Sequence, residues 1–197
     1  MRCRSLLIAA APLALIVQLA TAAEETKQQP ADPTPPPLGT ASFTPPPAVE
    51  EEPLTANTFV VRAAVANMAE VELGQLAAAR STDPKVQAFA RKMVEQHGQS
   101  LQQLRAAAAD AKIALPATVD EKHRELKQSL SSLQGEEFDA AYAKAMAKGH
   151  DEAVALFDAA AHASKLPESL RAYAAKALPV VRQHRDGAQE LHASEAD

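Results

Sequence analysis

Apolar residues recur at alternating intervals of four and three in the alanine-rich stretch from residue 57 to residue 192. The pattern is cleanest near the C-terminus, in the series Leu170, Ala174, Ala177, Val181, His184, Ala188 and Leu191. This spacing places the whole series on one face of an α-helix, as the packing of antiparallel helices requires. β-branched residues are sparse in this stretch, which disfavours strands. The spacing therefore predicts an all-α domain over residues 57–192.

Helix-breaking residues divide this domain into four long helices and one short helix. Ser81-Thr82-Asp83-Pro84 separates the first two long helices, and a proline suits a first helical turn because its missing N–H has no partner there. Gly135 ends the short helix, and Lys165-Leu166-Pro167 forms the last turn. Pro179 is expected to kink the last helix. We predict long helices over residues 59–79, 84–112, 136–163 and 168–191, with a loop over 113–119 and a short helix over 120–133 in the connection between the second and the third.

The first 22 residues have the pattern of a secretory signal peptide. A basic start, Met1 to Arg4, precedes an apolar run from Leu6 to Leu19 that is too short and too early for a well-anchored membrane helix. Ala20-Thr21-Ala22 is a small-x-small cleavage site, so we expect the mature chain to begin at Ala23. The alternative is that the segment is retained as an N-terminal anchor.

Residues 23–56 are expected to form a disordered, proline-rich linker. Nine of the 14 prolines of the chain lie between Pro30 and Pro53, and apolar residues with helical or strand spacing are absent there. Such a segment is a semi-rigid spacer with no core of its own. It can also dock an envelope or cell-wall partner, although no residue favours that role. A short C-terminal tail, residues 193–197, follows the helical domain.

Composition argues against several functional classes. The formal net charge is −5, and nucleic-acid binding requires a concentrated basic face that this chain lacks. Cys3 is the only cysteine and lies inside the predicted signal, so the mature chain has no thiol ligand and no disulfide. Beyond the signal no apolar run approaches the ~18 residues of a membrane helix. We therefore expect no transmembrane segment in the mature chain.

Each long helix carries one ligand-type side chain within its predicted apolar stripe. These side chains are Glu72, His97, His150 and His184. The rest of the first three stripes consists of Val61, Val65, Met68 and Leu76, then Val86, Ala90, Met93, Leu101 and Leu104, then Tyr142, Met146, Ala153 and Phe157. A buried polar group costs stability unless it is paired, and three imidazoles with a carboxylate suit one transition metal ion, Zn, Cu, Fe or Mn. The ordinary alternative is a polar core cluster that binds no metal.

The level of each residue along its helix decides which of them can meet. At a rise of about 1.5 Å per residue, His150 and His184 lie at similar distances from the turn between their helices, and His97 can join them near the middle of the bundle. Glu72 lies roughly 8 Å nearer its own turn than His97 does. That offset is too large for Glu72 and His97 to share one ion with the predicted helix ends.

Other polar residues of these helices are weaker candidates for metal ligands. Glu95 and Asp151 point away from the stripes, and either can act as an outer carboxylate that orients a histidine. His123 lies on the short connecting helix, and His162 and His192 lie at helix ends. A cation is favourable at the C-terminus of a helix, so we expect these three histidines to be exposed.

The helical segments resemble those of a bacterial exported family, domain of unknown function 4142 (DUF4142). The resemblance rests on FVVRAAVANMAEVELGQLA, DPKVQAFARKMVEQHGQSLQQL, FDAAYAKAMAKGHDEAVALF and AYAAKALPVVRQH, in this order. It implies a ferritin-like four-helix bundle in a periplasmic or outer-membrane protein, and it implies no settled activity. The recurrent features of the family match Glu72, Met93, His97, His150, Leu178-Pro179 and His184.

The chain departs from the family pattern at two positions. Gln96 stands where an acidic residue commonly precedes the histidine, and Leu101 stands where an asparagine often follows it. Both changes are expected to remove polar groups near His97. Ferritin-like di-iron enzymes also carry Glu-x-x-His on two helices, whereas valine or alanine lies three residues before His97, His150 and His184. The sequence therefore argues against a di-iron oxidase.

Three kinds of function remain open at this point. The first is a non-enzymatic envelope or stress-related binding protein, whose histidines hydrogen-bond within a polar core. The alternative is a periplasmic metal-binding bundle with a three-histidine site. The third is a metal-dependent enzyme, for which no nucleophile with an adjacent base is visible. The predicted location is the periplasm or cell envelope of a bacterium.

Overall fold

The computed structural model describes residues 54–194. The predicted signal peptide, nearly all of the proline-rich linker and the end of the C-terminal tail lie outside the described residues. Within residues 54–194 the chain forms five helices and no strand, so the predicted all-α class is confirmed. The helices are α1 (Ala56–Arg80), α2 (Pro84–Asp110), α3 (Glu121–Ser131), α4 (Gly135–His162) and α5 (Glu168–Ser194).

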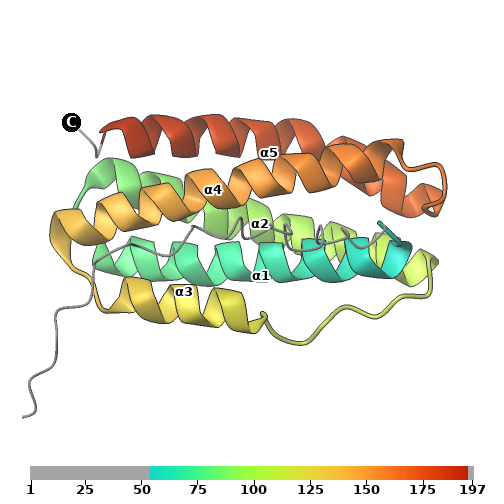
Figure 1. Ribbon diagram of the computed structural model, residues 1–197, viewed down its shortest axis with the longest axis horizontal. Helices are drawn as coiled ribbons and strands as arrows, with labels where there is room; N and C mark the ends of the chain where they lie inside the picture. Colours follow the sequence, from blue (N-terminus) through green and yellow to red (C-terminus); the bar gives the residue numbers. More distant parts are fainter. Residues whose placement is uncertain (1–53, 195–197) are drawn as a thin grey trace, which may run out of the picture. The chain divides into compact units, whose positions relative to one another are not determined.

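The four long helices pack as two antiparallel pairs. Helices α1 and α2 form one pair and α4 and α5 the other, and the pairs meet where α2 packs on α5 and α1 packs on α4. Figure 1 shows the four helices side by side, with the connection between α2 and α4 returning along the bundle through the short helix α3. The predicted bundle with an extra helix in this connection is confirmed, and the finer ferritin-like assignment stays a prediction.

Local sequence signals account for the ends of the helices. Thr55 caps α1 in a reciprocal capping box with Thr58. The carboxylate of Asp83 accepts hydrogen bonds from the first backbone N–H groups of α2, and Pro84 occupies the first turn as expected. Asp120 caps α3 in the same way. Gly135 has a φ of +56°, a left-handed conformation that glycine adopts without strain, and α4 begins there.

Helix α5 continues as one helix through Pro179. The proline lies on the exposed side, where the backbone carbonyl that loses its hydrogen bond can be solvated. A kink at this position stays a prediction. Among residues 54–194, none of the helices combines the length and the apolar character that a membrane span requires.

Two apolar clusters fill the ends of the bundle. The cluster at the end that holds the α4–α5 turn, here the α4–α5 end cluster, includes Phe59, Leu104, Phe157, Leu170 and Tyr173. The cluster at the other end, here the α1–α2 end cluster, includes Leu73, Val86, Phe138, Tyr142 and Met146. Both draw residues from all four long helices, as expected when each helix buries one stripe.

A layer of buried polar side chains separates the two end clusters. It consists of Asn67, Glu70, His97, His150 and His184. On every long helix these residues lie, along the sequence, between residues of one end cluster and residues of the other. We call this set the central polar layer, and it contains the three histidines that the sequence singled out.

The buried face of α1 differs from the predicted stripe. Val61 is 36% exposed, and Met68, Glu72 and Leu76 are only partly buried. Helix α1 instead buries the face that carries Gly74, where a Cβ would lie 2.9 Å from the Ala90 carbonyl oxygen of α2. Small residues at this face let the backbones of α1 and α2 approach closely, while Phe59 and Leu73 of α1 fill the two end clusters.

Candidate metal centre

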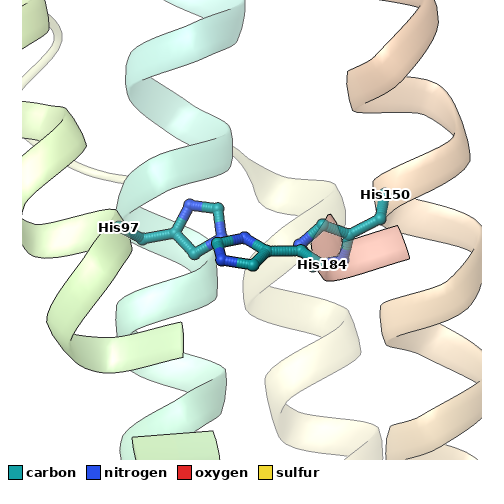
Figure 2. Close-up of side chains that lie close together, drawn as sticks. All are labelled: His97, His150 and His184. Carbon is teal, nitrogen blue, oxygen red and sulfur yellow. The ribbon is translucent and has the colours of Figure 1, made fainter. Parts of the chain in front are cut away.

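Three helices each bring one histidine to the centre of the bundle. The ring of His97 on α2 lies 5.6 Å from that of His150 on α4, between centroids, and 5.0 Å from that of His184 on α5. His150 and His184 are 5.4 Å apart. The exposed fractions of the three residues are 8%, 1% and 1%. Figure 2 shows the rings converging from separate helices, so the structure brings together the three predicted histidine ligands.

One nitrogen of each ring donates a hydrogen bond to an oxygen outside the cluster. His97 Nδ1 lies 3.0 Å from Asn67 Oδ1, and His150 Nδ1 lies 2.8 Å from the backbone carbonyl oxygen one turn earlier on α4. His184 Nε2 bonds the side-chain oxygen of Gln96. A carbonyl or amide oxygen can only accept, so each of these three nitrogens carries the ring proton.

The orientation of the Asn67 amide is fixed by its other contacts. Its Nδ2 donates to the Ala63 carbonyl oxygen at 2.7 Å and to the Tyr173 hydroxyl at 3.3 Å. The Tyr173 hydroxyl also lies 2.8 Å from Ser100 Oγ. The nitrogen of the amide is therefore occupied on the far side, and its oxygen faces His97. This network sets the tautomer of His97 with the proton on Nδ1.

The remaining nitrogen of each ring is left with a free lone pair. His97 Nε2, His150 Nε2 and His184 Nδ1 are buried and have no hydrogen-bond partner among the described residues. One nitrogen from each ring lies within 4.8 Å of one nitrogen from each of the other two. Three buried acceptors without a donor are costly, by about 1–3 kcal/mol each. One cation at their centre would satisfy all three.

Burial keeps the imidazoles of His97 and His184 neutral. Loss of solvation, and then repulsion by His150 and His184, holds the pKa of His97 well below its ordinary value of 6.5. Loss of solvation, followed by repulsion from His150 and Lys92, lowers the pKa of His184 to about 3. Neutral imidazole is the form that binds a metal, so neither ring has to lose a proton at pH 7 before it does so.

Glu72, the fourth predicted ligand, lies outside this cluster. Its side chain is 38% exposed, and its carboxylate pairs with Lys127 of α3 at 2.7 Å. Because the predicted stripe of α1 was wrong, a residue expected to face the core faces α3 instead. Glu72 also lies nearer the α1–α2 turn than His97 does, as predicted from their positions along the helices.

The other residues that the sequence considered are also remote from the cluster. Glu95 and Asp151 are exposed, and each accepts a hydrogen bond from a glutamine on the surface, so neither orients a histidine. The side chain of His162 is 77% exposed, as predicted. His123 is more buried than predicted, with 23% of its side chain exposed, because its Nδ1 bonds the capping residue Asp120 at 2.5 Å.

Sequence reasoning missed Asn67 and Glu70. Glu70 is 9% exposed, its Oε2 has no hydrogen-bond partner in residues 54–194, and its Oε1 lies 3.9 Å from His150 Nδ1. Burial raises the pKa of Glu70, although His150 acts in the opposite direction. A signal for Asn67 was present, because Asn67 and His97 are equally far from the α1–α2 turn.

Gln96 belongs to the site, contrary to the expectation from the family pattern. The replacement of an acidic residue by glutamine was expected to remove a polar group near His97. The amide oxygen of Gln96 instead accepts the proton of His184 Nε2. An amide keeps the hydrogen-bond acceptor of a carboxylate without its charge, so Gln96 can orient His184.

Two cavities border the histidines. A small one, about 30 Å³, is lined by Asn67, Glu70, His97 and His150 among others, and it has room for one or two water molecules. A larger one, about 160 Å³, lies between α2 and α5, and its inner wall includes His97 and His184. The cluster therefore borders a small cavity on the side of α1 and α4 and a larger one between α2 and α5.

Comparisons with known proteins give a family and nothing more specific. No curated protein matches the chain. No solved structure matches it either. A family model described as "Domain of unknown function (DUF4142)" matches residues 40–191, a span that includes every residue of the central polar layer. The chain therefore belongs to the DUF4142 family.

Proposed function

We propose that this protein is a metal-binding helical bundle in which His97, His150 and His184 hold one transition metal ion. The observation that supports the proposal is the set of three buried, unpartnered ring nitrogens, together with an oxygen acceptor behind each ring. Histidines that bind a metal nearly always donate their other N–H to a carbonyl, a carboxylate or water. All three rings follow that rule.

The donor set favours Zn²⁺ or Cu²⁺ over Fe and Mn. All three donors are imidazole nitrogens, which suit zinc and copper, and these ions stand at the strong-binding end of the divalent series. Manganese prefers carboxylate and water ligands. The buried carboxylate of Glu70, 3.9 Å from His150 Nδ1, places a group of the opposite sign behind the ring of His150. Such a charge offsets the cost of burying a cation.

A polar core without metal is the second candidate, and the existing hydrogen bonds of the rings favour it. In that case ordered water in the small cavity would have to satisfy the free nitrogens. The small cavity is lined by His97 and His150 but not by His184, so water there leaves the lone pair of His184 without a donor. A cation satisfies all three, and for this reason we place metal binding first.

The predicted signal peptide and proline-rich linker indicate where in the cell this site would function. We infer that the bundle is exported and works in the periplasm or cell envelope, at the end of a spacer. A bundle of this kind would hold or buffer metal outside the cytoplasm, and no catalytic step is needed for that role. The absence of cysteine ligands suits an oxidising compartment, where thiolates are lost to disulfide formation.

The first experiment is elemental analysis and calorimetric titration of the chain, purified without a polyhistidine tag. We expect about one equivalent of Zn²⁺ or Cu²⁺, with a stabilisation of about 2.7 kcal/mol when free metal is 100 times the dissociation constant. His150→Gln should weaken binding by more than the roughly 10- to 100-fold that loss of an outer partner costs.

His162→Ala is the matched control, because His162 lies on the same helix and is exposed. It should bind metal as the wild type does. If wild type and His150→Gln both lack a stoichiometric site, the metal proposal is wrong and the polar core is the better account. Equal loss of binding in His162→Ala would move the site to the helix surface and also contradict the proposal.

A further inference from the structure

We propose that the metal ion in the three-histidine site takes a small anion as its fourth ligand, and that this anion enters through the pocket between α2 and α5. The inference rests on the proposed metal site. Three protein ligands on a tetrahedral ion leave one coordination position open, and open positions bind water or an exogenous ligand. The accessibility and the charge of the two sides of the cluster decide which ligand can reach this position.

The pocket between α2 and α5, here the α2–α5 pocket, connects the cluster with the surface. Its inner wall includes His97 and His184, and its outer residues include Gln103, Lys176 and Val180, which are all exposed. His97 is the most exposed of the three histidines, at 8% against 1% for the other two. The volume of about 160 Å³ holds a small anion such as azide or bicarbonate, whereas a polymer or a large cofactor would not fit.

The lining of the α2–α5 pocket favours a negative ligand. It combines amide and hydroxyl side chains with the ammonium group of Lys176, and none of the residues of 54–194 that line it is acidic. No ion pair in the described part of the chain occupies Lys176. Lys92 also acts on His184 electrostatically. Positive charge at the mouth of a pocket raises the local concentration of anions.

The opposite side of the histidine cluster, toward α1 and α4, carries acidic groups and disfavours an anion. There the cavity is only about 30 Å³, and its wall includes the buried carboxyl group of Glu70. The wider groove beyond it, between α1 and α4, is lined by Glu70, Asp120 and Glu152 as well as by basic residues. A carboxylate near the route opposes an incoming anion. The charge arrangement therefore directs anions to the α2–α5 side and leaves water for the interior side.

The test is a titration of the Cu²⁺-loaded full chain with azide, followed by visible absorption and electron paramagnetic resonance. Direct binding of azide to copper produces a charge-transfer band and changes the copper spectrum. We expect a saturable band in the wild type and none in His150→Gln. Lys176→Met should weaken azide binding roughly threefold to tenfold through loss of the local charge. Val180→Trp should fill the mouth of the pocket and weaken it further.

Lys148→Met is the matched control, because Lys148 is exposed on α4 and lines neither cavity. It should bind copper and azide as the wild type does. A wild type that holds copper but shows no spectral change with azide overturns this inference and leaves the metal site standing. A protein that holds no copper overturns both. An azide band that persists unchanged in Lys176→Met and Val180→Trp shows that the anion arrives elsewhere, which overturns the assignment of the pocket.

Discussion

The end clusters and the central polar layer lie on the same four helices, yet burial has opposite consequences in them. In the α4–α5 end cluster the rings of Phe59, Phe157 and Tyr173 pack with centroids 5.7–6.2 Å apart. Removing such rings from water stabilises the fold. In the central polar layer three imidazoles meet at similar distances, but each buries a lone pair that no donor in residues 54–194 satisfies.

The end clusters consist of structural residues, whereas the central polar layer contains the candidate functional residues. An apolar cluster needs nothing from outside the chain, since its favourable contacts are complete when the helices pack. The central polar layer is complete only when a cation or water occupies it. The buried histidines lower the stability of the metal-free fold. A bound ligand would explain why such residues occupy the core.

The largest expected effect comes from the α4–α5 end cluster. Phe59 is fully buried against two aromatic rings, so Phe59→Ala should lower the free energy of unfolding by about 3–5 kcal/mol. The loss should be the same with and without added metal, because the ring is remote from the histidines. Urea denaturation in both conditions measures it. A loss below about 1 kcal/mol would mean that this cluster does not stabilise the bundle as described.

Acid should destabilise the metal-free protein through the central polar layer. The pKa values of His97 and His184 are lowered in the folded state. The unfolded chain therefore binds more protons below pH ~6.5, and stability falls as the pH drops from there. An unfolded histidine is half protonated at pH ~6.5, so each contributes about 1 kcal/mol between pH 6.5 and 5.5 and the two together about 2 kcal/mol.

Glu70 acts with the opposite sign in this titration. Burial raises its pKa, so the folded state binds its proton more readily and gains stability as the pH falls toward the carboxyl range. Glu70→Gln should therefore make the acid destabilisation steeper. Melting curves of the metal-free protein at half-unit steps from pH 7.5 to 5.5 give the slope. A flat profile would contradict the assignment of neutral, buried histidines.

Replacing a histidine of the central polar layer by an apolar residue is expected to have a smaller effect on stability. His184→Leu removes one free lone pair, and partly exposed Gln96 can turn its amide oxygen to water. In the metal-free protein we expect the free energy of unfolding to change by less than about 1 kcal/mol or to rise, because a buried polar group is replaced by an apolar one of similar size. A loss as large as that of Phe59→Ala would identify His184 as an ordinary, satisfied core residue.

The smallest effect is expected at Glu72. Its ion pair with Lys127 is partly exposed, and such pairs contribute about 0–1 kcal/mol. Glu72→Ala should leave the metal content at the wild-type value, measured by the same elemental analysis. Loss of metal would show that the carboxylate joins the site, as the sequence had suggested, and that α1 presents a different face to the core.

Much of this fold was predictable because the relevant signals are local. The four-three spacing and the breakers at Asp83-Pro84, Gly135 and Leu166-Pro167 depend only on neighbouring residues, and the helices begin and end close to the expected positions. The three histidines were found for the same reason, since each interrupts a strongly apolar stripe on its own helix.

Helix α1 was the exception, and its amino acids explain why. It carries bulky apolar residues on more than one side, so Val61 and Met68 defined a plausible stripe that the bundle does not bury. The face in contact with α2 contains Gly74, and hydrophobicity gives such small residues little weight. Glu72 was therefore assigned to the centre, and Asn67 and Glu70, which do lie there, were overlooked.

The sequence by itself determined an all-helical bundle and the burial of three histidines, because helical periodicity relates residues only a few positions apart. Tertiary structure alone decided which face of α1 packs inward, which nitrogen of each ring carries a proton, and which nitrogen is left without a partner in residues 54–194. These features depend on contacts such as His97 with Asn67 and His184 with Gln96, which join different helices. No local pattern encodes them, because helix rotation is set by packing among side chains far apart in the chain.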